Sequence, residues 1–374
     1  METLRDNPEV IWGFLLALAV VLLLTPGVGR FARYIGVVDE PGETRRVHTH
    51  PVPRLGGIAL LLGIFVPALA FLELDGPYRG ILLGAAIATT VGAIDDFRGL
   101  PWWGKLGGQV AAGAVAVGFG VTVDRFTFPG FGSQELPEWA AGAATIVWVV
   151  AIMNMVNFLD GMDGLAAGIC AIAGSTFAII GLSLGAPEAA LLSAIVAGAC
   201  FGFLHHNFYP ARIFMGDSGA LLLGFLLATL AIEGLVKTAA LATLVLPLLV
   251  LAIPIVDTSF VVAKRLKYRQ PLYEADRTHL HHRFMNIGFS QKRAVAYMYA
   301  WCGILAAAAL STRFLPPRPR GEWDLSNAFI AGGMALLAVA ASVYIAYLLE
   351  IVKLANPRIR RREEQARDDA RRSA

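Results

Sequence analysis

Residues 138–184 read EWAAGAATIVWVVAIMNMVNFLDGMDGLAAGICAIAGSTFAIIGLSL. Two apolar runs, 138–159 and 164–184, flank a short polar segment, DGMD, that contains two Asp and one Gly, and a second Gly, Gly164, begins the second run. A helix of about 20 apolar residues is long enough to cross the hydrocarbon core of a bilayer. The segment therefore predicts two membrane-spanning helices joined by a tight polar reversal.

The whole chain repeats this pattern. Of its 374 residues, 56% are hydrophobic and 16% charged, and the mean hydropathy is +0.62; ordinary soluble chains have about 25% charged residues. This composition excludes a soluble or disordered protein, and three cysteines, each in an apolar run, exclude a disulfide scaffold. We predict an all-α, polytopic membrane protein with about eleven spans, near 9–26, 56–74, 80–95, 104–122, 138–159, 164–184, 186–206, 217–235, 238–263, 293–312 and 325–352.

The Lys and Arg residues set the predicted orientation. With alternating connections assigned to opposite faces, 24 of the 31 Lys and Arg fall on one face, which the positive-inside rule makes cytoplasmic. The N-terminus is then outside and the C-terminus inside. We expect one transmembrane domain over residues 1–355, cytoplasmic loops near 27–55, 96–104, 207–216 and 264–292, and a basic cytoplasmic tail over 356–374.

The unusual polar clusters all fall on the predicted cytoplasmic face. They are RRVHTHPVPRLGG (45–57), GAIDDFRGL (92–100), NMVNFLDGMDGL (154–165), HHNFYPARIFMGDSG (205–219) and ADRTHLHHRF (275–284). Because a carboxylate at the bilayer centre costs about 2.5–3.5 kcal/mol, we expect their Asp residues at helix ends that open on water.

Adjacent carboxylates in this set should have different roles. Asp95 and Asp96 diverge by about 100° on a helix, so they cannot point at one atom; Lys105 follows, where it could reach an anion or anchor the span. Asn154 and Asn157 share a helical face, and Asp160 and Asp163 lie at the glycine break. Helix capping accounts for one Asp and one Asn, which leaves a site as the favoured interpretation.

The remaining clusters combine an acid with cations. Asp217 could be a plain N-cap or a metal ligand at a helix start, where free N–H groups also attract anions. The other candidate substrate contacts lie in three of the clusters: one upstream of Asp217, four in the 275–284 cluster and two at the membrane surface. They are Asn207; Arg277, His279, His281 and His282; and His48 and Arg54.

Together these residues predict a cytoplasmic pocket for phosphoryl transfer. Carboxylates without thiolates favour Mg2+, with Mn2+ as the alternative, bridging acids to a diphosphate. A transfer between a cytosolic nucleotide and a membrane lipid needs mainly alignment and charge neutralisation. The alternative class is a transporter or flippase, which would place its acids nearer the bilayer midplane. We expect no nucleic-acid partner.

The ordered motifs resemble the polyprenyl-phosphate N-acetylhexosamine-1-phosphate transferases, which are of the glycosyltransferase 4 type. They are HTHPVPRLGG, AIDDF, NMVNFLDGMDGLAAG, NFYPARIFMGDSGALLLG, PIVDTSFVVAKR and DRTHLHHRFMNIGFS. DRTHLHHRF is similar to the WecA/TagO branch, whereas the MraY branch has three consecutive histidines. The resemblance implies transfer of GlcNAc-1-phosphate from UDP-GlcNAc to undecaprenyl phosphate, with Mg2+, at the inner (plasma) membrane. It also implies a homodimer and a role in starting a cell-envelope polysaccharide, such as an O-antigen or teichoic acid.

The resemblance also implies residue roles. Asp217 matches the metal-binding Asp, with Asp95 or Asp96 near the metal and the other a candidate base; of these two we assign Asp96 to the metal. Asn157, Asp160 and Asp163 match the nucleotide-sugar pocket, and the loop with Arg277 and the histidines matches a diphosphate or sugar contact. UDP-MurNAc-pentapeptide or another UDP-hexosamine is the alternative donor, and an aspartyl-phosphate intermediate is the alternative to direct attack.

Overall fold

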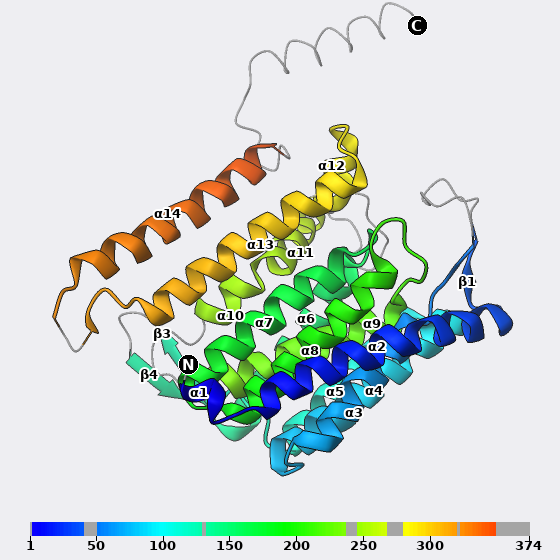
Figure 1. The fold of residues 1–374 in the computed structure, drawn as a ribbon, viewed down its shortest axis with the longest axis horizontal. Coiled ribbons are helices and arrows are strands. Elements are labelled where there is room, and N and C mark those ends of the chain that lie inside the picture. The colour runs from blue at the N-terminus through cyan, green and yellow to red at the C-terminus, as the bar shows by residue number, and fades with distance from the viewer. Residues whose placement is uncertain are drawn as a thin grey trace, which may run out of the picture.

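The computed structural model describes residues 2–40, 51–128, 132–236, 245–267, 280–319 and 322–348. Most of these residues are helical (Figure 1). Eight of the helices are long and apolar enough to cross a membrane, which confirms a polytopic membrane protein; eleven spans and the orientation stay predictions. The helices are α1 Glu2–Arg5, α2 Glu9–Tyr34, α3 Gly56–Phe71, α4 Gly76–Arg98, α5 Trp102–Gly118, α6 Glu138–Leu159, α7 Leu165–Leu184, α8 Pro187–Asn207, α9 Gly216–Ala231, α10 Val245–Val250, α11 Ala252–Lys267, α12 Leu280–Asn286, α13 Gln291–Phe314 and α14 Leu325–Leu348, with a π-helical turn at Ile232–Val236.

The predicted helical fold is confirmed for most of the described residues, and two connections form short strand pairs. β1 (Val38–Asp39) pairs antiparallel with β2 (Val52–Pro53), and β3 (Arg125–Phe128) pairs antiparallel with β4 (Gly132–Glu135). Backbone N–H and C=O groups outside a helix need other partners, and a short ladder supplies them.

The first span is longer than predicted because α2 continues through Pro26 to Tyr34. A proline inside a helix leaves the carbonyl four residues earlier without its N–H partner, here that of Leu22. The buried His206 of α8 donates a hydrogen bond from Nε2 to this Leu22 oxygen, at 3.0 Å. A neighbouring helix therefore satisfies the carbonyl that proline leaves free, and α2 does not end there.

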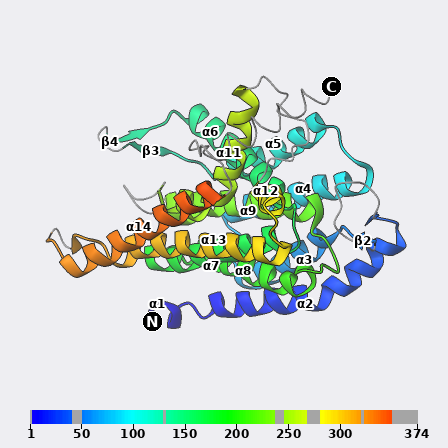
Figure 2. The ribbon, with the colours of Figure 1, turned by 90° about the horizontal axis from the view of Figure 1, so that it is seen from above.

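The predicted span 238–263 is divided in the structure. Its described part forms α10 and α11, which meet at Leu251. Pro254 has no N–H for the carbonyl of Val250, which favours the break. Figure 2 shows α11 running across the direction of α2, α7 and α13.

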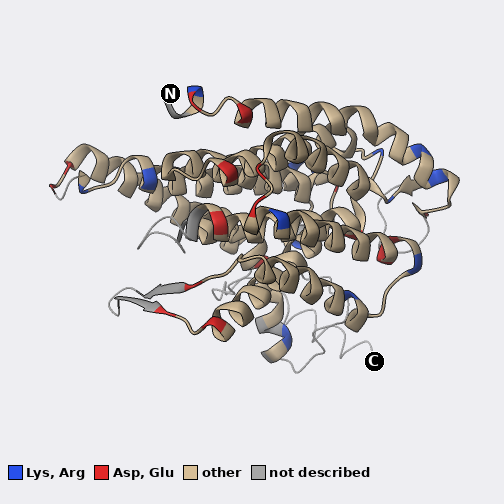
Figure 3. Cartoon of the chain, turned by 90° about the horizontal axis from the view of Figure 1, so that it is seen from below, with Lys and Arg blue, Asp and Glu red and all other residues tan. Residues whose placement is uncertain are grey.

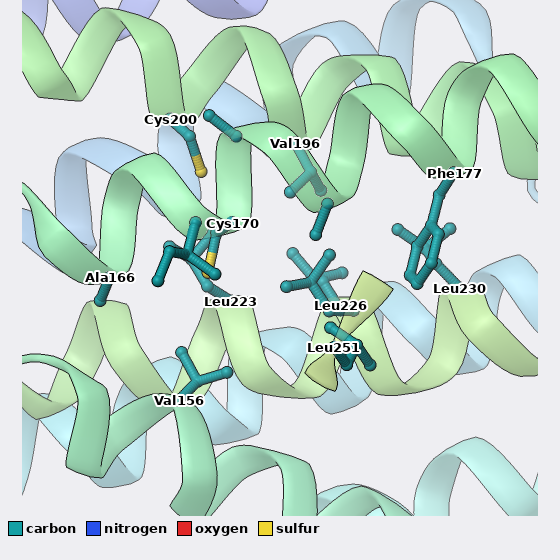
Figure 4. Packing of buried hydrophobic residues seen from close by; sticks show 14 of the residues in the cluster. Val156, Ala166, Cys170, Phe177, Val196, Cys200, Leu223, Leu226, Leu230 and Leu251 are labelled. Carbon is teal, nitrogen blue, oxygen red and sulfur yellow. The ribbon is translucent and has the colours of Figure 1, made fainter. Parts of the chain in front are cut away.

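Helix α9 lies at the centre of the bundle. It is almost wholly buried and packs against α3, α4, α6, α7 and α8 (Figure 1). Cys170 and Cys200 lie among aliphatic side chains there (Figure 4), and Cys302 is also buried. All three cysteines are free and buried, as expected from their places in apolar runs.

The outer surface is apolar, as a lipid-facing surface requires. Figure 3 shows long helical stretches without charged residues. Helix α14 packs along α13, where Trp301 Nε1 donates to the Ser342 hydroxyl at 2.9 Å, and it exposes large side chains such as Phe329 and Leu336. In water such an exposed apolar surface would favour aggregation, whereas in a bilayer it faces acyl chains.

Candidate active site

The site is built around the first turn of α9, where Asp217 lies. Two glycines let neighbouring helices approach this turn closely. A Cβ on Gly92 of α4 would overlap the backbone of Asp217 and Ser218, and a Cβ on Gly57 of α3 would overlap that of Ser218 and Gly219. Any larger residue at these positions would push α4 or α3 away from Asp217, so the two glycines set the spacing of the site.

Asp96 caps α9 from the neighbouring helix. Its Oδ1 accepts the N–H of Asp217 at 2.8 Å, and its Oδ2 accepts the N–H of Ser218 at 3.0 Å and the Ser218 hydroxyl at 2.8 Å. These are N–H groups that the first turn of a helix leaves without partners. Asp217 is therefore not the N-cap of α9, and Asp96 already uses both carboxylate oxygens.

A second cluster brings together Asp95, Lys105, Asn157 and Asp217 from α4, α5, α6 and α9. The Lys105 ammonium contacts an Asp217 oxygen, and it lies 3.2 Å from Asp95 Oδ2 and 3.3 Å from Asn157 Oδ1. Asn157 Nδ2 donates to the other Asp217 oxygen at 2.7 Å. Asp95 Oδ1 accepts the N–H of Leu100 at 2.5 Å, just beyond the end of α4. The predicted divergence of Asp95 and Asp96 is confirmed, since they face different partners.

Asp160 lies in the connection between α6 and α7, and its charge interacts with the charges of the site. Burial and the charges of Asp217, Asp96 and Asp163 raise the pKa of Asp160 well above its ordinary value, and the positive charge of Arg54 only partly opposes them. Loss of water favours the neutral acid, and so do neighbouring carboxylates. The reversal predicted from the Gly-rich motif thus brings Asp160 toward Asp217, Asp96 and Arg54.

Three of the predicted substrate contacts use their polar atoms within the protein. Asn207 is buried; its Oδ1 accepts the N–H of Gly164 at 3.0 Å, and its Nδ2 donates to the Ile213 carbonyl at 2.9 Å. Asp163 Oδ2 accepts the N–H of Ala211 at 2.9 Å. Asn154 exchanges two hydrogen bonds, of 2.8 and 3.2 Å, with the buried amide of Gln109. These contacts favour a structural role for the three side chains, in which they hold the elements around the site together.

The other predicted residues lie at the edge of the described structure. Arg54 Nη1 lies 3.5 Å from Asp39 Oδ1. His48, Arg277 and His279 lie outside the described residues, and of His281 and His282 only the backbone, in α12, is described. The start of α12 is held by the buried Asp257, whose Oδ1 accepts the N–H of Leu280 at 2.7 Å.

The cluster around Lys105 has the donor set of a hard cation. An ammonium group lies among oxygens of two carboxylates and one amide, and this ammonium bridges Asp95 and Asp217. Within the described ranges, no three His, Cys, Asp or Glu residues form a group that could hold a metal ion by themselves. Mg2+ commonly takes only one or two protein carboxylates and completes its shell with water and substrate phosphate. Asp95 and Asp217 fit such a site, and Asp96 fits it less well.

Sequence reasoning missed two residues of the site. The Ser218 hydroxyl completes the cap on α9, a role that its position beside Asp217 could have suggested. Tyr299 of α13 donates from its hydroxyl to the Gly164 carbonyl at 2.5 Å, although it lies 135 positions away in the chain. Nothing in the local sequence around Tyr299 marks this contact.

The structure is thus a polytopic helical bundle with carboxylates and a lysine gathered at the start of one buried helix. The profile of glycosyl transferase family 4 matches residues 78–235, which include all four members of the Lys105 cluster. The chain belongs to this family.

Relatives cover most of the chain. It is 36% identical over 303 residues to the probable undecaprenyl-phosphate N-acetylglucosaminyl 1-phosphate transferase of Bacillus subtilis (strain 168). This alignment covers 81% of this chain and 84% of that protein. It is 34% identical over 351 residues to the decaprenyl-phosphate N-acetylglucosaminephosphotransferase of Mycobacterium leprae (strain TN), at 86% and 88% coverage. A phospho-N-acetylmuramoyl-pentapeptide-transferase of Moorella thermoacetica is 33% identical over 327 residues, at 81% and 98% coverage.

Proposed function

We propose that this protein transfers GlcNAc-1-phosphate from UDP-GlcNAc to undecaprenyl phosphate or a similar polyprenyl phosphate, giving polyprenyl-diphosphate-GlcNAc and UMP. The relatives named for N-acetylglucosaminyl phosphotransfer support the donor and the class of acceptor. The observation that carries the proposal is the acidic cluster in which Asp95, Asn157 and Asp217 surround the Lys105 ammonium, because such oxygens suit a divalent cation that would in turn bind a diphosphate.

The proposed reaction is a direct displacement. An oxygen of the lipid phosphate attacks the sugar-linked phosphorus, and the bond from that phosphorus to the UMP oxygen breaks, so that UMP leaves with the electron pair. A phosphate monoester is largely ionised at pH 7, so it needs no strong base. The protein contributes alignment and charge, which are the main requirements of phosphoryl transfer. The hydrogen bonds that already engage Asp95 and Asp217 favour this route over an aspartyl-phosphate.

We assign Mg2+, with Mn2+ as the alternative, to Asp217 and Asp95 rather than to Asp217 and Asp96. The support is geometric, since both Asp96 oxygens cap α9 whereas Asp95 lies beside Asp217. When bound, the ion would neutralise charge on the diphosphate and the leaving UMP. Lys105 would then contact the substrate phosphates, as its ammonium is already in the cluster.

The proposed location is the inner (plasma) membrane with the site on the cytoplasmic side. The excess of Lys and Arg on the connections at that face supports this orientation, and a UDP-sugar donor is consistent with it. The homodimer and the role in starting a cell-envelope polysaccharide remain proposals that rest on the resemblance.

Mass spectrometry of the lipid product tests the function. Purified protein is incubated with polyprenyl phosphate, Mg2+ and one of UDP-GlcNAc, UDP-GalNAc or UDP-MurNAc-pentapeptide. The expected result is polyprenyl-diphosphate-HexNAc with UDP-GlcNAc and little product with the others. If only UDP-MurNAc-pentapeptide gives a product, that nucleotide sugar is the donor in place of UDP-GlcNAc. Uptake of unchanged substrate into vesicles would support a transporter instead.

A further inference from the structure

The connection between α6 and α7 is held by side chains from two other helices at a single residue, Gly164. This glycine has φ +77°, and both of its backbone polar groups have side-chain partners. Its N–H donates to Asn207 Oδ1 at 3.0 Å, and its carbonyl accepts the Tyr299 hydroxyl at 2.5 Å. The same carbonyl accepts the N–H of Gly168 at 2.9 Å, in the first turn of α7.

Tyr299 is fitted closely to this turn. A Cβ on Gly168 would overlap the phenol ring and hydroxyl of Tyr299, so the ring lies directly on the α7 backbone. Tyr299 is half-buried and packs against the hydrophobic core. A buried phenol that reaches one backbone carbonyl fixes both the direction of its own ring and the position of that carbonyl.

The segment that Tyr299 holds carries the acids of the site. Asp160 and Asp163 lie within four residues of Gly164; Asp163 accepts the N–H of Ala211, and the charge of Asp160 interacts with that of Asp217. Helix α13 lies outside the residues matched by the family profile, 78–235. Its contact with Gly164 therefore ties a C-terminal helix to the region that carries the Lys105 cluster.

We propose that Tyr299 is a positioning residue for the nucleotide-sugar donor, acting through the Gly164 carbonyl to hold the Asp160–Asp163 segment in its binding position. This inference rests on the proposed function. Within the part of the chain that the structure describes, Tyr299 makes no hydrogen bond to a member of the Lys105 cluster, so its effect should fall on donor binding rather than on the transfer step.

The test compares Tyr299→Phe with a matched control, Tyr297→Phe. Both changes keep the ring and remove one hydroxyl, and Tyr297 is 40% exposed and contacts the rings of Phe284 and Phe289. Loss of one hydrogen bond predicts that Tyr299→Phe raises the KM for UDP-GlcNAc about three- to tenfold. The kcat and the KM for polyprenyl phosphate should stay near those of the wild type, and Tyr297→Phe should change none of the three.

An equal rise in both KM values, or a fall in kcat alone, would overturn the positioning role, because general loosening of the fold would affect both substrates. Hydrogen exchange gives a readout that does not depend on the activity. Amides of residues 164–168 should exchange faster in Tyr299→Phe than in the wild type or Tyr297→Phe, and unchanged exchange would also overturn the inference. Wild-type protein that does not turn over UDP-GlcNAc would reject the proposed function, while the exchange result would still decide whether Tyr299 holds this segment.

Discussion

The carboxylate of Asp96 caps the helix that begins beside Asp217, with the Asp217 N–H donating to Asp96 Oδ1 at 2.8 Å. Two adjacent acids in one motif are thus divided between two tasks. Asp96 holds the backbone that carries Asp217, while Asp95 contributes to the charged cluster itself. The α4–α9 contact therefore connects the stability of the bundle to the geometry of the proposed metal site.

Removing the cap should lower stability without changing the metal requirement. Ser218→Ala deletes a donor to Asp96 and should lower the unfolding free energy by about 1 kcal/mol, and Asp96→Asn should lower it by about 2 kcal/mol because a buried N–H loses its acceptor. Thermal unfolding in detergent measures this effect, with Ser175→Ala, a partly buried helical serine of α7, as the control. A raised Mg2+ requirement with unchanged stability in Asp96→Asn would instead make Asp96 a metal ligand.

Asp217→Asn should abolish the metal-dependent reaction while the protein stays folded. Removing a negative charge from the cation site costs transition-state stabilisation of several kcal/mol, so Mg2+-dependent UMP release from UDP-GlcNAc should fall about a hundredfold or more. The exposed Asp124 provides a charge-matched control, Asp124→Asn, with unchanged UMP release. Near-normal turnover in Asp217→Asn would remove Asp217 from the metal role.

Lys105→Met should make stability depend on Mg2+. Without the ammonium, the Asp95 and Asp217 carboxylates face each other uncompensated, which should cost about 1–3 kcal/mol in EDTA. Added Mg2+ should restore much of the lost stability. Differential scanning calorimetry in EDTA and in Mg2+ measures this difference. Lys292→Met, which removes a charge that lies over the Tyr209 ring, is the control and should show no such rescue. Equal destabilisation in both buffers would argue against a cation site between the two acids.

Asp160→Asn should stabilise the protein at neutral pH. The pKa of Asp160 is raised in the folded state, so the folded protein binds more protons than the unfolded chain between the two pKa values, and stability falls as pH rises through that window. In EDTA, the melting temperature of Asp160→Asn should exceed that of the wild type at pH 7. The difference should shrink as the pH falls and vanish only below the unfolded pKa of about 3.9, where the acid is protonated in both states. A difference that does not change with pH would contradict the assigned cause.

The His206–Leu22 hydrogen bond predicts that substitutions in α8 and α2 have coupled effects on the free energy of unfolding. His206→Phe leaves the Leu22 carbonyl unsatisfied and should cost about 1–2 kcal/mol, whereas His205→Phe, at its exposed neighbour, should cost little. Pro26→Ala supplies an N–H to the same carbonyl, so His206→Phe should cost less in that background, with a coupling of about 0.5–1 kcal/mol. Additive effects in this double-mutant cycle would show that the two groups do not share the Leu22 oxygen.

The sequence alone was sufficient to predict a polytopic helical protein, the family resemblance and most residues of the site. Apolar runs must become helices in a bilayer, because no other single segment satisfies its own backbone there. Helical geometry also predicted that Asp95 and Asp96 would diverge. These conclusions depend on chain-local properties, namely run length, periodicity and motif order.

Only the tertiary structure showed which acid lies beside Asp217, that Asp96 caps α9, and that Tyr299 reaches Gly164. These contacts join residues more than a hundred positions apart, and they depend on how each helix is rotated and how closely glycines let it approach its neighbours. Periodicity identifies the buried face of a helix but does not specify which partner lies against it, so these pairings follow from packing alone.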